Sequence, residues 1–285
     1  MKRRALALTA ALLLLAAGAL AAHDMFLKLE SYFLEPDART RVMLLNGTFE
    51  RSENAIARDR MADVSVVGPG TDDVSHPDTA LWSDSAETAV LPIETGAAGT
   101  YAVGVSTRPR TFTLSGQDFD AYLRHDGVLD ALERRREAGR LGTEATETYA
   151  KHVKAVLQVG EDRSEGWKAR LGYPVELVPL ANPYRLSVGD TLPLRLLEEG
   201  DPVPDQIVWA APEGWTPADS ADGGDEDGGA HREPIRTRTD ADGVVRIPLR
   251  EPGRWYVRLI HMTRAEDDPD VDYVSKWATL TFEVR

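Results

Sequence analysis

The sequence contains no cysteine, so neither disulfides nor thiolate metal sites can form. It is also poor in basic residues, since 33 lysines and arginines face 47 aspartates and glutamates, a formal net charge of −14. Nucleic acids and anionic membrane surfaces require a basic face on their partners, so we expect neither as a partner. The length of 285 residues is sufficient for two ordinary domains.

The short motifs that mark common enzyme classes are absent as well. The chain has no Gly-x-Ser-x-Gly, His-Glu-x-x-His, phosphate-binding loop or dinucleotide fingerprint. Asp268, Asp270 and Asp272 have the opening spacing of a calcium-binding loop. However, Tyr273 stands where that loop requires glycine, and Thr279 stands where it requires a bidentate glutamate. We therefore expect neither enzymatic activity nor a calcium loop.

Long hydrophobic runs are missing, and the one apolar stretch at the start of the chain is short. Basic residues at positions 2–4 precede an apolar run over residues 5–18, and small residues follow it, as in a cleavable export signal. The run is too short for a membrane span. We expect a signal peptide over residues 1–21, cleaved after Ala21 or one residue later after Ala22. The processed protein would then be periplasmic, without direct membrane insertion.

The rest of the chain is dominated by strand patterns. Apolar side chains alternate with small or polar ones over residues 101–105 and again over 192–196, which is the period of two expected for β-strands. The fold class is therefore predicted to be mainly β, with two immunoglobulin-like antiparallel β-sandwich domains. We place the first at residues 22–116 and the second, which is also similar to carboxypeptidase-regulatory domains, at 173–285.

Residues 117–172 are predicted to form a helical insertion between the two β-domains. One helix is expected over 117–138, with Ser115 as its N-cap and a break at Gly127. A second helix is expected over Thr143–Val159, because its apolar residues follow a helical spacing and glutamates occupy its first turn.

The main candidate for chemistry is the place where the predicted signal ends. If cleavage follows Ala21, the amine of Ala22 and the amide and imidazole nitrogens of His23 can form fused chelate rings, with Asp24 as an additional oxygen donor. This nitrogen-rich, roughly planar set suits Ni(II) or Cu(II), with Co(II) as a further alternative. If cleavage follows Ala22, His23 becomes a histidine brace, which suits copper. A histidine at this position can also be incidental.

His261 is the second candidate. It is in phase with Trp255, Val257 and Leu259, so its side chain is predicted to point inward at the end of a strand. A single histidine at such a position is more often a hydrogen-bonded core residue than a metal ligand. His152 is predicted to be a boundary residue on the apolar stripe of the second helix.

Several motifs, taken in order, together resemble a known family. They are Ala22-His23-Asp24-Met25-Phe26-Leu27, Phe119-Asp120-Ala121-Tyr122-Leu123, Tyr149-Ala150-Lys151-His152-Val153-Lys154, Asn182-Pro183-Tyr184 with Gly189-Asp190, Thr239-Asp240-Ala241-Asp242-Gly243, His261-Met262 and Trp277-Ala278-Thr279-Leu280-Thr281-Phe282. They are similar to those of exported bacterial proteins of unassigned function that are labelled nickel-uptake-related and linked to NikM-type transporter components. The resemblance spans nearly the whole processed chain.

The resemblance implies a metal-binding role. In NikM-type components an N-terminal amine, an amide and a second-position histidine hold nickel, which maps onto Ala22 and His23 if cleavage follows Ala21. His261 belongs to a recurrent motif of the resembled family and is a second expected ligand. We therefore expect a non-enzymatic periplasmic protein that binds nickel and assists a metal-uptake transporter at the membrane. The alternatives are a copper histidine-brace redox protein and a metal-free structural or binding β-sandwich protein.

Overall fold

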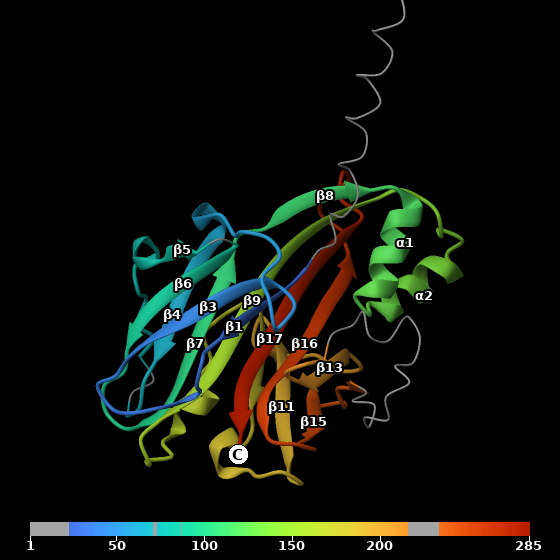
Figure 1. The fold of residues 1–285 in the computed structure, drawn as a ribbon. Helices are drawn as coiled ribbons and strands as arrows, with labels where there is room; N and C mark the ends of the chain where they lie inside the picture. Colours follow the sequence, from blue (N-terminus) through green and yellow to red (C-terminus); the bar gives the residue numbers. More distant parts are fainter. Residues whose placement is uncertain (1–22, 71–72, 86, 216–233) are drawn as a thin grey trace, which may run out of the picture.

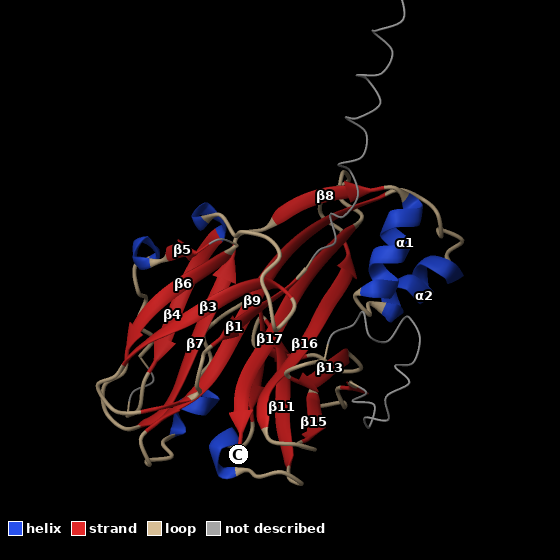
Figure 2. Ribbon diagram, in the orientation of Figure 1, coloured by secondary structure: helices blue, strands red, loops and turns tan. Residues whose placement is uncertain are grey.

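The computed structural model describes residues 23–70, 73–85, 87–215 and 234–285 (Figure 1). The predicted signal peptide and Ala22 lie outside the described residues. The described chain is mainly β, as predicted, with two α-helices beside the strands (Figure 2). The strands are β1 (Asp24–Lys28), β2 (Phe33–Leu34), β3 (Arg39–Gly47), β4 (Met61–Val67), β5 (Ser83–Ser85), β6 (Thr88–Glu94), β7 (Gly99–Thr107), β8 (Arg110–Leu114), β9 (Ala145–Val159), β10 (Val175–Pro179), β11 (Thr191–Glu198), β12 (Asp201–Pro202), β13 (Ile207–Pro212), β14 (Ile235–Arg238), β15 (Val244–Pro248), β16 (Gly253–Arg264) and β17 (Tyr273–Val284).

These strands form three sheets within the described residues. The large sheet has the order β14-β13-β16-β17-β9-β7-β4, and β2 and β8 also pair with β9. One small sheet has the order β1-β3-β6-β5, and the other contains β10, β11, β12 and β15. The pairing is antiparallel except where β9 meets β17 and β2. Strands from all three predicted segments therefore join one sheet.

The two small sheets pack on opposite faces of the large one. Thr279 and Thr281 of β17 donate hydrogen bonds to backbone carbonyls of β1, so the sheet that contains β1 covers their face. Lys154, which pairs in register with Leu280, forms an ion pair with Glu176 of β10, so the sheet that contains β10 covers the other face. The result is a layered sandwich around a shared central sheet.

The predicted helix over Thr143–Val159 is wrong, because these residues form the 15-residue central strand β9. From Ala150 onward every residue of β9 is buried, so neither face shows the alternation of apolar and polar residues that identifies a half-exposed strand. The buried charged side chains Lys151 and Lys154 find polar partners inside the protein. In residues 143–159 the apolar residues are widely spaced, with charged residues between them, and this spacing resembles that of a helix face.

The other predicted helical stretch is confirmed, with the expected break. It forms α1 (Gly116–His125) and α2 (Leu129–Glu137), and Ser115 Oγ accepts a hydrogen bond from the amide of Asp118 at 3.3 Å. Gly127 between them has φ = +73°, a conformation that favours glycine. The helices cover one end of the large sheet, where they pack on residues such as Ile260 and Trp277.

In the described ranges no helix has the length and hydrophobicity to span a membrane.

Candidate functional site

The start of β1 is held in place by side chains of the large sheet. Three alternate carbonyl oxygens at the beginning of the described chain accept hydrogen bonds from buried side chains. They are the carbonyls of His23 (from Lys151 Nζ), Met25 (from Thr279 Oγ1, 2.9 Å) and Leu27 (from Thr281 Oγ1, 2.7 Å). The predicted first residues of the processed protein therefore lead into a fixed strand.

The imidazole of His23 lies beside a carboxylate. Its Nδ1 is 3.2 Å from Glu53 Oε2, and the two side chains are 23% and 31% exposed. Arg51 contacts the other oxygen of Glu53 at 3.3 Å. Nδ1 is the ring nitrogen closest to the backbone, and it is the one that can close a chelate ring with the amide of its own residue. The His23 side chain is thus partly exposed, and the nitrogen required by the predicted N-terminal site contacts a carboxylate.

Asp24 has a different environment from the one predicted. Its Oδ2 lies 3.2 Å from Nε of Arg258, and the two side chains are only 14% and 3% exposed. Burial raises the pKa of Asp24, and the nearby Arg258 guanidinium opposes that shift. Because the carboxylate is paired with Arg258, we interpret Asp24 as a residue that neutralises a buried arginine. As long as that pair is intact, Asp24 is not free to serve as the predicted oxygen donor.

A buried group of ionisable side chains lies around Lys151, close to the start of β1. Burial lowers the pKa of Lys151 to about 8, although the charges of Asp24 and Asp126 oppose this shift. Burial raises the pKa of Glu147 to about 7, although Ser275 and Tyr122 donate hydrogen bonds to it. This group was not predicted, because residues 143–159 were expected to form a helix with Glu147 in its first turn.

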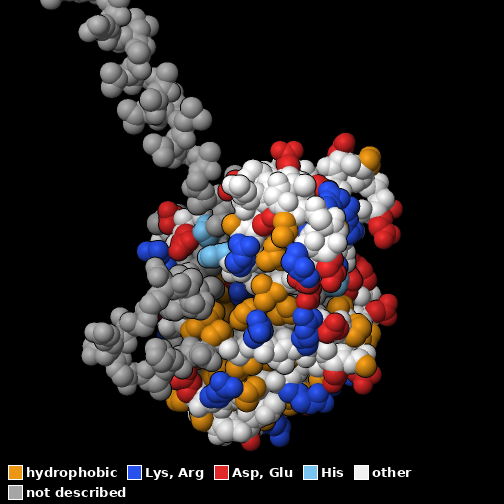
Figure 3. Space-filling model, turned by 90° about the vertical axis from the view of Figure 1, so that its right-hand side faces the viewer, with side chains coloured by type: hydrophobic (Ala, Val, Ile, Leu, Met, Phe, Trp, Pro, Cys, Tyr) orange, Lys and Arg blue, Asp and Glu red, His pale blue; other side chains and the backbone are white. Residues whose placement is uncertain are grey.

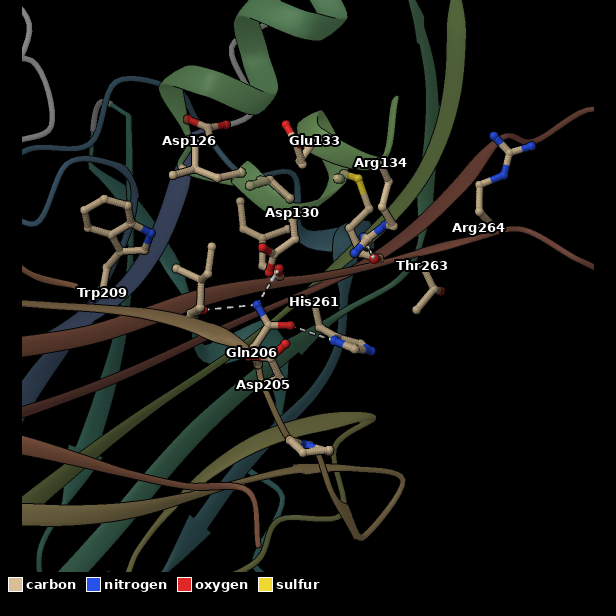
Figure 4. Close-up of a pocket in the computed structure, with 18 residues that line it drawn as sticks. Asp126, Asp130, Glu133, Arg134, Asp205, Gln206, Trp209, His261, Thr263 and Arg264 are labelled. Carbon is tan, nitrogen blue, oxygen red and sulfur yellow. Dashed lines mark hydrogen bonds between the residues drawn. The ribbon is translucent and has the colours of Figure 1, made fainter. Parts of the chain in front are cut away.

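His261 lies near the end of β16, at the boundary of two cavities. Its Nδ1 is 2.8 Å from Gln206 Oε1 (Figure 4), and its Nε2 is 3.2 Å from Glu198 Oε2. Burial lowers the pKa of His261, and the Glu198 carboxylate opposes the shift. One cavity, of about 540 Å³, lies between the α1–α2 turn and β16. The other, of about 360 Å³, lies between His261, Glu198 and the loop that follows β16.

His23 and His261 lie on opposite faces of the large sheet. His261 pairs in register with Lys276, so both side chains share one face. Lys151 pairs with Trp277, the next residue along β17, so Lys151 points to the other face. Lys151 donates its hydrogen bond to the carbonyl of His23. The structure therefore does not bring the two predicted metal ligands together.

Side-chain clusters with three or more potential ligands are absent from the part of the chain that the structure describes. A transition-metal site at the start of the chain would therefore need main-chain nitrogens in addition to His23. On the face of the molecule seen in Figure 3, positive and negative side chains are interspersed, with apolar side chains between them.

The sequence of this chain matches the model of a protein family. The family model described as "Domain of unknown function (DUF4198)" matches residues 20–263. The chain belongs to the DUF4198 family. The matched region of this DUF4198 protein includes both His23 and His261. The family description names neither a metal nor a transport role, so the nickel-uptake label and the link to NikM-type components remain predictions.

No curated protein matches the DUF4198 chain in sequence. Among solved structures, the D0-D1 domain of intimin is 10% identical, with 91% of this chain and 97% of that chain covered and a TM-score of 0.20. The chicken CNTN1 FN1-FN3 domains are 8% identical, with 93% and 69% covered and a TM-score of 0.22. Escherichia coli alpha-2-macroglobulin activated by porcine elastase is 10% identical, with 92% and 20% covered and a TM-score of 0.23. Scores this low carry no argument about function.

Proposed function

We propose that this DUF4198 protein binds a divalent transition metal, nickel foremost, at the start of its processed chain in the periplasm. The amine of Ala22 and the amide and Nδ1 nitrogens of His23 would hold the ion. The observation that carries the proposal is the position of His23, whose side chain is 23% exposed and whose Nδ1 lies 3.2 Å from the Glu53 carboxylate. Co(II) and Cu(II) are alternative ions for the same donors.

The anchoring of β1 supports this proposal on energetic grounds. A flexible N-terminal peptide must lose conformational freedom when it chelates an ion, at a cost of about 1–2 kcal/mol for each backbone residue that becomes fixed. Here the carbonyls of His23 and Met25 are already bound by Lys151 and Thr279, so the strand that carries the ligand is already ordered. The Glu53 carboxylate adds negative charge beside the chelating nitrogen.

The biological role that we propose is delivery of the bound metal to an uptake transporter at the membrane. This part of the proposal rests on the resemblance described above and on the terminal position of the site. A ligand set at the end of a chain is open on one side, so a second protein can approach the ion and exchange ligands. No catalytic step is required of the protein.

Calorimetric titration of Ni(II) and Cu(II) into correctly processed protein tests the metal site. The wild type is expected to bind one equivalent at the N-terminus, and the His23→Ala variant is expected to lose it. His76→Ala is a matched control, because His76 also contacts a carboxylate, that of Asp63 at 2.7 Å, but is 60% exposed and far along the chain. Retention of this equivalent by His23→Ala would show that the chain has no N-terminal site.

The intact mass of the same sample distinguishes the two possible chelates. A chain that begins at Ala22 has the amine–amide–imidazole set, whereas a chain that begins at His23 has a copper histidine brace. His261 cannot supply a second histidine for a brace, because it faces the other side of the large sheet. Binding of neither ion would favour the metal-free structural role.

A further inference from the structure

We infer that His261 and Glu198 form a second binding site for a divalent cation of the zinc or nickel class, separate from the N-terminal site. The site would use a nitrogen and an oxygen donor from β16 and β11 on the face of the large sheet opposite His23. It does not depend on where the signal peptide is cleaved. The two sites can therefore be tested independently.

The first step of the argument is the hydrogen bonding of Gln206. Its Nε2 donates to the carbonyls of Ile207 at 3.0 Å and of Ile260 at 3.2 Å, which fixes the orientation of the amide (Figure 4). The amide oxygen of Gln206 therefore faces Nδ1 of His261 at 2.8 Å. An amide oxygen can only accept, so the proton of the imidazole must be on Nδ1.

The second step concerns the other ring nitrogen. When Nδ1 of a neutral imidazole carries the proton, Nε2 presents a lone pair. In the neutral form this lone pair faces Glu198 Oε2 at 3.2 Å, so two acceptors point at one another. The other carboxylate oxygen, Oε1, accepts a hydrogen bond from Lys276 Nζ at 2.9 Å. A bound cation would relieve the repulsion between Nε2 and Oε2.

The distance between these two acceptors suits one metal ion. Bonds from zinc to imidazole nitrogen and to carboxylate oxygen are about 2.0–2.2 Å long. Two ligands 3.2 Å apart then subtend an angle of about 100° at the ion, close to the values for neighbouring ligands in tetrahedral and octahedral sites. Gln206 has the role of the outer hydrogen-bond acceptor that orients a histidine ligand.

The surroundings of the pair leave room for further ligands. His261 and Glu198 are 16% and 32% exposed, and they line the cavity of about 360 Å³. The loop after β16 contributes Glu266, Asp267 and Asp268 to the same cavity. Because the described residues bring no third side-chain ligand to this pair, water would complete the coordination. The positive charge of Lys276, 2.9 Å from Glu198 Oε1, opposes the binding of a cation. We therefore expect weaker binding than at a site with four protein ligands.

Titration of Zn(II) and Ni(II) into full-length processed protein in the His23→Ala background tests this inference. One equivalent is expected to bind, to disappear when His261→Gln is added, and to weaken by about tenfold or more when Glu198→Gln is added. Adding His76→Ala instead is the control and is expected to change nothing. Thermal melts of each variant establish that it is folded, and Glu198→Gln retains the size and shape of the original side chain.

Nitrogen NMR of the His261 ring provides a second readout. We expect a proton on Nδ1 alone at pH 7 without metal, and a shift of Nε2 when Zn(II) is added. A proton on both nitrogens at pH 7 would mean that the pair is an ordinary ion pair and would overturn the inference. Binding that is unchanged in His261→Gln would also overturn it. Loss of one equivalent in His23→Ala but not in His261→Gln would support the N-terminal site and reject this one. Loss in His261→Gln but not in His23→Ala would support this site and reject the N-terminal one.

Discussion

Lys154 Nζ lies 2.6 Å from Glu176 Oε2, and the two side chains are only 3% and 5% exposed. The ion pair connects the central strand β9 to β10 of a small sheet. Glu176 also accepts hydrogen bonds from the amides of Leu171 and Tyr173, both at 3.0 Å. Because both side chains are almost completely buried, each charge is compensated mainly by the other.

Removing both charges of this pair is expected to destabilise the protein by less than the sum of the two single removals. Lys154→Met or Glu176→Gln alone should lower the free energy of unfolding by about 3–5 kcal/mol, because each leaves one buried group uncompensated. In the double variant the neutral amide at position 176 can still accept from the backbone, so the cost should be smaller than the sum. Urea unfolding measures all three, and strict additivity would contradict the interpretation. Glu165→Gln, which breaks the exposed contact with Lys168, should cost less than about 1 kcal/mol.

Stability is expected to decrease in mild acid because of His152. The ring is 4% exposed and its Nδ1 lies 2.9 Å from Ser106 Oγ. Burial lowers the pKa of His152 from 6.5 to about 4. In the unfolded chain His152 binds a proton below about pH 6.5, whereas in the folded protein it does so only below about pH 4. Its contribution to stability is therefore complete above pH 6.5 and is lost as the pH falls from 6.5 to 4. The loss between pH 7 and pH 5 is about 2 kcal/mol.

Urea unfolding of wild type and His152→Gln at the two pH values isolates this effect. The variant should be less stable at pH 7 but show a drop toward pH 5 that is smaller by about 2 kcal/mol. His76→Gln, whose ring is 60% exposed, is the matched control and should retain the full drop. An unchanged drop in His152→Gln would assign the acid sensitivity to other groups.

The threonines that anchor β1 are expected to contribute stability through their hydroxyl groups. Thr279→Val and Thr281→Val keep the side-chain shape, but the first removes the side-chain donor to the Met25 carbonyl and the second leaves the Leu27 carbonyl with only the Tyr32 hydroxyl as side-chain donor. Each should lower the free energy of unfolding by about 1–3 kcal/mol. Thr263→Val, at an exposed position of β16, should have little effect in the same denaturation assay. Equal effects at all three positions would show that the hydrogen bonds to β1 make no specific contribution to stability.

Arg135 is expected to be required for the local structure of the two helices. Its guanidinium is fully buried and donates to Asp120 at 2.9 Å and to the carbonyls of Arg140 and Thr143 at 3.1 and 2.7 Å. Arg135→Lys retains the charge but cannot reproduce this geometry, so we expect a loss of about 3 kcal/mol. Hydrogen exchange should show reduced protection in α1 and α2 first. Arg136→Lys, on the exposed side of α2, is the control.

Some features of the fold are encoded by residues close together in the chain, and others are not. The strand β7 and the N-cap at Ser115 were predictable, because alternation and capping depend on residues close together in the chain. Strand β9 was not, because the partners that neutralise Lys151 and Lys154 come from distant segments. His23 and His261 were identifiable by residue type. Their placement on opposite faces depends on the register of β16, β17 and β9, which no short motif reveals.

The position of β17 inside the large sheet also has a consequence for folding. This late segment, residues 273–284, pairs with β16 on one side and with β9 on the other. As long as this segment is missing, the earlier strands lack their central neighbour and the threonines that bind β1. The sheet can therefore close only after the end of β17 has been released, and such long-range pairing is slow to form. A chain truncated before Tyr273 would expose two unpaired strand edges and is expected to aggregate.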